Sequence, residues 1–353
     1  MYIVIAILVF GILIAVHELG HFLAAKACGV KVNEFAIGMG PAIFKKQGKE
    51  TLYSLRLLPI GGYCAMEGED DASEDPGAFS SKPRWKRFII LAAGSFMNFL
   101  VGFILVVIIC LQLGTFAGTT ITELADGFPL EGESGLMVGD TIKSIDGYQT
   151  YYSNDFSTFM NRAKGRAVDI TLIRDGEKIT LSKFPLVAKE YVDENGEARV
   201  RFGMSFNLLE NTLGEKMKFA CYTTVDFVRQ VWLGLTDLVR GVVGIRDLSG
   251  PVGIVSVIND VGSASASSAD AFLSVSYICA FIAVNLAVMN MLPIPALDGG
   301  RIFFLLLTWI IEKIARRRLN PKYEGYIHAA VLILLFGLMA FVMVNDVVRI
   351  VNG

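Results

Sequence analysis

Two histidines and a glutamate lie close together inside an apolar stretch near the N-terminus: His17, Glu18 and His21. Residues four positions apart share one face of an α-helix, so both imidazoles can bind one Zn²⁺ while the glutamate acts as a general base. Ionisable groups in an apolar segment are costly and usually pair, bind a ligand or line a wet cavity. The alternative is a chance pentapeptide at the edge of a bilayer. We predict a zinc site with His17 and His21 as ligands and Glu18 as the catalytic residue.

A catalytic zinc site needs a third protein ligand and one open position. We favour Asp298, because Pro293 and Pro295 end the preceding helix and two glycines after the aspartate permit a tight turn. The alternative role for Asp298 is to cap the following helix. The third histidine of the chain, His328, begins the last apolar segment, and we expect it to face the helix bundle rather than a metal.

The composition excludes several classes of protein. The 353 residues are 53% hydrophobic with a mean hydropathy of +0.53, which is too apolar for an ordinary soluble enzyme. The net charge of −2 gives no basic surface for nucleic acid, so we expect no such partner. The five cysteines include no CxxC pair, which argues against a cysteine zinc site and a disulfide framework.

Four apolar segments reach the roughly 20 residues that cross a bilayer: 2–25, 88–113, 271–292 and 326–350. We expect the first to be a retained anchor rather than a signal peptide, because no basic residue precedes it. A fifth stretch, 302–314, is too short to cross and is expected at the interface. The pattern predicts a polytopic α-helical membrane protein with about four transmembrane helices.

Basic residues predict the orientation. They gather at 82–87, before the second apolar segment, and at 316–322, before the fourth. Positive loops stay in the cytosol, so the first and last loops are expected inside and the segment 114–270 outside the cytoplasmic membrane. The histidines then lie toward the cytosolic side.

The connecting segments contain two β-rich regions. Four short pieces of the first loop favour strands in a small curved sheet or hairpin pair at the membrane surface: 30–37, 42–46, 51–57 and 63–66. An acidic run at 67–75 is expected to be a solvated loop.

In the outer segment, a glycine loop at 134–147, a helix at 154–163 and an Asp-Gly hairpin at 168–184 resemble a PDZ domain. A generic small β-rich domain is the alternative. The stretch 217–245 is expected to form an amphipathic helix pair and 262–269 a flexible linker.

These predictions divide the chain into eight segments. They are a transmembrane helix with HExxH (1–26), a β region with an acidic loop (27–87), a second transmembrane helix (88–113), a PDZ-like domain (114–205), amphipathic helices with a linker (206–269), a third transmembrane helix (270–292), a loop with an interfacial helix (293–325) and a fourth transmembrane helix (326–353).

Several motifs together resemble one family. They are HELGH at 17–21, NxxPxPxLDG at 290–299, the approach to the second apolar segment at 79–98, and LSGPVGI at 248–254. On these residues the chain resembles the site-2 protease family of intramembrane zinc metalloproteases, in its bacterial branch with one external PDZ domain. HExxH alone is shared by many metalloproteases, but its combination with a distant LDG is highly specific.

The resemblance implies peptide-bond hydrolysis within or beside the membrane, as the site-2 step of regulated intramembrane proteolysis. His17, His21 and Asp298 would bind Zn²⁺, and Glu18 would activate water. The β region would offer a strand edge to unwound substrate, and the PDZ-like domain would admit substrates already trimmed outside by an upstream site-1 protease. Implied substrates are single-pass membrane proteins such as anti-sigma factors, or remnant signal peptides. The implied substrate-binding residues are Asn98, Asn290, Pro293 and Pro295.

One departure from the family pattern is Ser95, which follows Gly94 where a proline is usual. This leaves the local shape near Asn98 open. Two other classes of function also remain open: a catalytically silent adaptor that uses the PDZ-like groove, and a transporter of zinc or protons.

Overall fold

The computed structural model describes residues 2–69, 73–192, 198–265, 267–315 and 321–352. Part of the predicted basic cluster, Arg316 to Arg318, and two acidic residues, Asp70 and Asp71, lie outside these ranges. The chain divides into two compact units, Met1–Cys110 with Lys218–Gly353, and Leu111–Met217, each of which we describe by itself.

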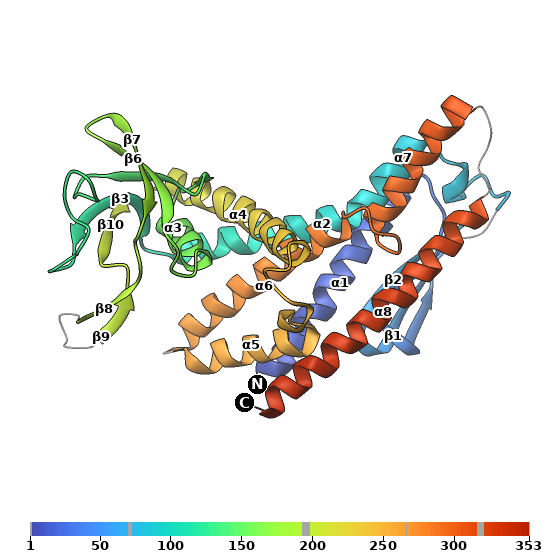
Figure 1. Cartoon of the computed structure of the whole chain (residues 1–353). Coiled ribbons are helices and arrows are strands. Elements are labelled where there is room, and N and C mark those ends of the chain that lie inside the picture. The colour runs from blue at the N-terminus through green and yellow to red at the C-terminus, as the bar shows by residue number, and fades with distance from the viewer. Residues whose placement is uncertain (1, 70–72, 193–197, 266, 316–320, 353) are drawn as a thin grey trace. The chain divides into compact units, whose positions relative to one another are not determined.

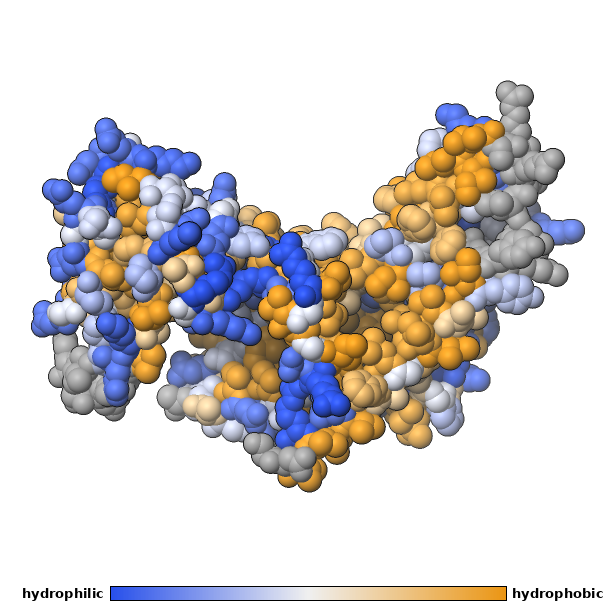
Figure 2. Space-filling model, in the orientation of Figure 1, coloured by the Kyte–Doolittle hydropathy of each residue, from blue (hydrophilic) through white to orange (hydrophobic). Residues whose placement is uncertain are grey.

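Four helices of the larger unit are long and apolar enough to cross a membrane, and they lie where the sequence predicts the four spans. They are α1 (Tyr2–Ala27), α2 (Arg84–Gln112), α6 (Ser268–Asn290) and α8 (Pro321–Asn352) (Figure 1). Only 6% of the most apolar window of α8 is buried, and Figure 2 shows hydrophobic residues along this helix at the surface. Such a surface suits lipid rather than water.

Glycines allow the spanning helices to approach closely. A Cβ on Gly20 of α1 would overlap the carbonyl of Ala93 in α2, and a Cβ on Gly102 of α2 would lie 2.7 Å from Val284 of α6. Without a hydrophobic driving force between helices in lipid, such close backbone packing is a main source of association. The first contact sets the spacing of α1 and α2 beside the two histidines, and the second sets the spacing of α2 and α6.

The strands β1 (Val32–Gln47) and β2 (Leu52–Met66) are long and bent, so each contributes two segments to one curved antiparallel sheet. Residues 34–37 of β1 pair on one side with 52–55 and on the other with 62–65 of β2. The four short pieces predicted from the sequence are therefore present, with 62–66 at one edge. The bends fall at glycines with positive φ, including Gly38, Gly40 and Gly61. Figure 1 shows this sheet beside α1.

A polar cluster holds three segments of this sheet together. Glu34 accepts hydrogen bonds from Ser54 at 2.6 Å and Arg56 at 2.8 Å, and Arg56 also contacts the Tyr63 hydroxyl. Burial alone would raise the pKa of Glu34, but the hydrogen bonds from Ser54 and Arg56 outweigh burial and lower that pKa. The edge segment at 62–66 is thus tied to its neighbours.

The acidic run after the sheet, which was predicted to be a solvated loop, makes hydrogen bonds and ion pairs with other segments. Glu67 accepts from Asn33 at 2.8 Å, Asp75 pairs with Lys31 at 3.2 Å, and Glu69 pairs with Arg301 of α7 (Asp298–Ala315). These bonds fasten the loop to the sheet and to the helix that carries Asp298.

Residues 217–245 do not form the expected helix pair. A single helix, α4 (Leu213–Val239), covers most of this stretch. It ends before Gly241, whose φ of +70° leaves the helical region. A separate helix, α5 (Pro251–Ala264), starts at Pro251 and takes up the beginning of the expected linker.

A buried carboxylate anchors the C-terminal half of α8. Asp346 is 1% exposed and accepts hydrogen bonds from the backbone N–H groups of Gly250 at 2.9 Å and Gly253 at 2.8 Å, at the start of α5. A helix N-terminus attracts negative charge because its first N–H groups lack helical partners.

We expect Asp346→Ala to lower the free energy of unfolding by roughly 2 to 4 kcal/mol, because two buried N–H groups lose their acceptor. Thermal unfolding of the purified protein in detergent would measure this loss. Asp346→Asn keeps an acceptor oxygen, so its free energy of unfolding should fall less. If Asp346→Ala unfolds at the same temperature as wild type, these two hydrogen bonds contribute nothing to stability.

The smaller unit has a sheet in the order β10-β3-β4-β6-β7, with β5 beside β4 and a separate β8–β9 hairpin. The strands are β3 (Phe116–Leu124), β4 (Thr141–Ile145), β5 (Tyr148–Gln149), β6 (Val168–Arg174), β7 (Glu177–Phe184), β8 (Lys189–Val192), β9 (Ala198–Arg201) and β10 (Met204–Leu209). The helix α3 (Ser153–Arg162) lies between β5 and β6 in the sequence. Asp175 and Gly176 both have positive φ between β6 and β7, which confirms the predicted Asp-Gly hairpin.

The glycine loop before β4 is clamped in place. Arg174 donates two hydrogen bonds of 2.7 Å to the buried Asp140 and another to the carbonyl of Gly135. Such bidentate pairs are among the stronger polar contacts in proteins, so the loop has a defined shape.

Candidate metal centre

The helix α1 presents His17 and His21 one turn apart on the same face. Both side chains are buried, with 8% and 7% of the residue exposed. The long apolar run around them favours a continuous helix, and their spacing of four residues places one imidazole above the other. The histidine ring centroids are 4.7 Å apart and the rings are nearly perpendicular.

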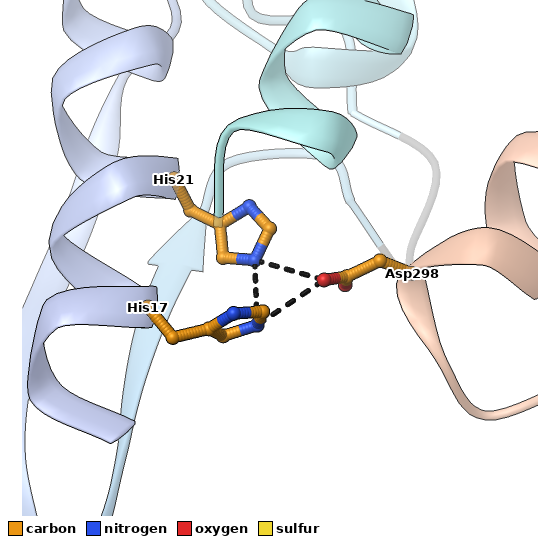
Figure 3. Close-up of side chains that lie close together, drawn as sticks. All are labelled: His17, His21 and Asp298. Carbon is orange, nitrogen blue, oxygen red and sulfur yellow. Dashed lines mark hydrogen bonds and ion pairs between the residues drawn. The ribbon is translucent and has the colours of Figure 1, made fainter. Parts of the chain in front are cut away.

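Asp298 brings a carboxylate to these imidazoles from the start of α7. Its Oδ2 lies 3.1 Å from Nε2 of His17 and 3.3 Å from Nε2 of His21, and the two Nε2 atoms are 3.2 Å apart. Figure 3 shows the three side chains converging from α1 and α7, with the contacts between them forming a triangle. Asp298, which is 281 positions from His17 and 277 from His21 in the sequence, thus meets both at one point.

The triangle has the dimensions of three ligands of one small metal ion. Tetrahedral zinc with ligand bonds of about 2.0–2.1 Å separates its ligand atoms by about 3.3 Å. The three observed separations, 3.1, 3.2 and 3.3 Å, are close to that value. In the part of the chain that the structure describes, this is the one cluster of three histidine, cysteine or acidic side chains with such geometry.

The hydrogen bonding around the triangle also favours a cation. Nδ1 of His21 lies 2.8 Å from the carbonyl oxygen of Ile90, so Nδ1 carries the proton and donates it. In the neutral ring the lone pair of His21 is then on Nε2, which faces a second nitrogen and a carboxylate oxygen. Apart from its contacts with the two imidazoles, the buried Oδ2 of Asp298 has no hydrogen-bond donor among the described residues. A positive ion between these atoms would relieve their mutual repulsion, so the residues fit zinc.

A glycine of α2 makes room for the cluster. A Cβ on Gly94 would overlap Nε2 of His21 and lie 2.8 Å from Cε1 of His17. The absence of a side chain at this position lets α2 pass directly beside the candidate metal-binding atoms. Gly94 and Ile90 are one turn apart on α2, so the same helix face holds the His21 ring and leaves space for it.

Glu18 lies next to the edge segment of the sheet. A Cβ on Gly62 would be 3.5 Å from Cγ of Glu18, in ordinary van der Waals contact. Residue 62 belongs to the segment that pairs with β1 on one side only, among the described residues. The glutamate therefore stands between the two histidines and an edge strand.

The turn before Asp298 is compact. A Cβ on Gly299 would overlap the backbone of Met291, and a Cβ on Gly300 would overlap the carbonyl of Ile294. Ala296 has a φ of +77°, a conformation that non-glycine residues rarely adopt. The two glycines and the bent backbone direct Asp298 toward α1.

The other predicted site residues lie around this turn and along α2. Asn98 is 1% exposed, one turn beyond Gly94, and its Oδ1 has no hydrogen-bond partner among the described residues. Asn290 is the last residue of α6, and Pro293 and Pro295 lie in the turn that follows. None of these four belongs to the metal triangle.

Ser95 leaves α2 as one continuous helix, and its buried hydroxyl has no partner in the described part of the chain. His328 is not part of the triangle, and its Nδ1 instead accepts the backbone N–H of Ala296. The sequence did not predict this hydrogen bond or the one from His21 to the Ile90 carbonyl. Each involves a backbone group, and every residue type except proline offers the same backbone donor and acceptor.

The chain is similar to known metalloproteases. Residues 5–338 match Peptidase family M50. A protein of Clostridium acetobutylicum that carries a zinc metalloprotease name is 38% identical over 351 residues, covering 99% of this chain and 98% of the relative. The regulator of sigma-W protease RasP of Bacillus subtilis is 28% identical over 425 residues, covering 98% of this chain and 97% of the relative. The zinc metalloprotease RasP of Bacillus licheniformis is 27% identical with 98% coverage of each chain.

Proposed function

The chain belongs to peptidase family M50, the site-2 protease family, and we propose that it cuts transmembrane segments of membrane-anchored proteins inside the bilayer. It is a zinc metalloprotease, and its four apolar helices make it an integral membrane protein. The proposal depends chiefly on one observation: two imidazoles of a spanning helix and the carboxylate of Asp298 lie 3.1–3.3 Å apart.

In the proposed reaction His17, His21 and Asp298 hold the zinc. When bound, zinc supplies a Lewis acid that polarises the scissile carbonyl and makes water more acidic. The Glu18 carboxylate removes the proton of the attacking water and then delivers it to the nitrogen of the leaving amine. The carbonyl of Ile90 holds the His21 ring through Nδ1, and this would keep Nε2 available to a bound metal.

The substrate must be extended before it can be cut, because a helix hides its peptide groups in internal hydrogen bonds. We propose that the edge segment at 62–66 pairs with the unwound segment, replacing the bonds that the helix loses. Support comes from the position of Gly62 against the Glu18 side chain. A peptide paired there would pass beside the general base.

We assign substrate binding to four further residues. The unpartnered amide oxygen of Asn98 can accept a hydrogen bond from a substrate backbone N–H. Asn290, Pro293 and Pro295 border the site from the end of α6 and the turn that follows.

The substrates we propose are single-pass membrane proteins of the anti-sigma factor type, or remnant signal peptides. The sigma-W name of the Bacillus subtilis relative supports the first class. We further propose that the chain lies in the cytoplasmic membrane with its active site toward the cytosol. The unit Leu111–Met217 would be a single external PDZ-like domain that admits substrates after an upstream protease has trimmed them.

Metal removal tests the proposal directly. The purified protein is reconstituted into liposomes with a single-pass substrate that has a short external segment, and the products are read by mass spectrometry. We expect cleavage within the transmembrane segment, its loss after treatment with a zinc chelator, and its return when Zn²⁺ is added.

The same preparation distinguishes the other classes of function. Release of Zn²⁺ from the liposome lumen with no peptide bond broken would favour a transporter. Capture of the substrate without cleavage, with or without zinc, would favour an adaptor. Either result would contradict the proposed protease.

A further inference from the structure

His328 makes a hydrogen bond to the turn that carries Asp298. Its Nδ1 accepts the backbone N–H of Ala296 at 2.8 Å, although His328 lies on α8 and Ala296 precedes α7. Ala296 is two residues from the metal-binding carboxylate. The contact is partly buried, which strengthens it relative to an exposed one.

The turn has few other means of holding its shape. Between residues 293 and 297, the two prolines have no N–H. The N–H groups of Ile294 and Leu297 bond to carbonyls of Leu292 and Ile294 at 2.7 and 3.1 Å, within the same stretch of chain. The N–H of Ala296 is therefore the donor in this turn that is tied to a distant element.

Ala296 also needs an external restraint. Its φ of +77° is unfavourable for a residue with a Cβ, and such conformations persist where the surroundings impose them. The His328 ring is itself held by the ring of Phe304 on α7, with a centroid distance of 5.3 Å. The imidazole thus touches both the turn and the helix that begins with Asp298.

We propose that His328 is a positioning residue for Asp298. It holds the Ala296 N–H, keeps the turn in its strained form and so keeps the carboxylate within reach of His17 and His21. This role rests on the proposed zinc site. It gives the third histidine of the chain a function in metal retention without direct coordination.

Two amide substitutions separate this role from bulk packing. The amide oxygen of asparagine lies near the place of Nδ1, whereas that of glutamine lies near the place of Nε2 and is directed away from Ala296. His328→Asn therefore keeps the acceptor, and His328→Gln and His328→Leu remove it. Tyr326→Leu is a matched control, because this neighbouring side chain on α8 is 70% exposed.

The experiment measures zinc affinity of the full-length protein in detergent by competition with a chromophoric chelator. We expect His328→Gln and His328→Leu to bind zinc about 10–100-fold more weakly, which is the loss seen when groups that orient a metal ligand are removed. His328→Asn and Tyr326→Leu should bind close to wild type. The rise in melting temperature on adding zinc should shrink only in the first two variants.

Asp298→Ala in the same assay tests the site separately. If it binds zinc as tightly as wild type, the proposed ligand set fails whatever happens at residue 328. If Asp298→Ala weakens binding but His328→Gln does not, or if His328→Asn loses as much as His328→Gln, the positioning role is overturned while the zinc site stands. Should His328→Leu not fold, the comparison of Asn with Gln decides the question.

Discussion

Replacing Glu18 with glutamine should abolish cleavage while leaving zinc in place. Glutamine has the shape of glutamate but cannot take a proton from water, so the reaction loses its general base. General acid–base groups contribute about 10²–10⁴-fold to rate, and we expect a loss of at least a hundredfold. The rate is measured on a membrane-anchored substrate, and zinc content is measured on the same sample.

The zinc content makes this result interpretable. Glu18 is not part of the metal triangle, so an unchanged zinc content shows that the site is intact. Glu74→Gln is a matched control, because Glu74 is an exposed residue of the acidic loop. Retained cleavage by Glu18→Gln would end the proposal that Glu18 is the base. Membrane peptides that accumulate in cells carrying this variant would identify the substrate.

The spanning helices could be predicted from the sequence because the thickness of a bilayer dictates their length and apolar character. The relation of His17 to His21 was predictable for a similar reason, since the helical repeat alone places them on one face. The place of Asp298 needed a chemical argument, namely that catalytic zinc takes a third protein ligand. Sequence spacing carries no information about how α7 meets α1.

Other features depend on tertiary packing and left no signal in the chain. The four strand pieces were recognisable, but their order, which puts residues 62–66 at an edge beside Glu18, comes from the pairing of β1 with two parts of β2. Residues 217–245 looked like two helices because their apolar stripe is long, yet no proline interrupts it and the helix continues through Gly234 to Val239. The bond from Ala296 to His328 joins a backbone group to a side chain 32 residues away.

Gly94→Ala should disable the metal site through a single methyl group. The new Cβ would overlap Nε2 of His21, which supplies one of the three metal-binding atoms, and would lie 2.8 Å from Cε1 of His17. The His21 ring cannot move aside without losing its 2.8 Å bond to the Ile90 carbonyl, which lies on the same helix as residue 94. We expect zinc affinity to fall at least about tenfold, with cleavage falling in proportion.

Alanine favours helices more than glycine does, so this substitution in α2 should stabilise the helix itself by up to about 1 kcal/mol. We therefore expect the variant to stay folded but to bind zinc more weakly. That result would show that the methyl group blocks the site and does not unfold the protein. Gly337→Ala is the matched control, because a Cβ at this position of the spanning helix α8 meets nothing within 4 Å. If Gly94→Ala kept both zinc and activity, α2 would have to lie farther from the histidines than this structure places it, and the proposed close fit around the metal would be wrong.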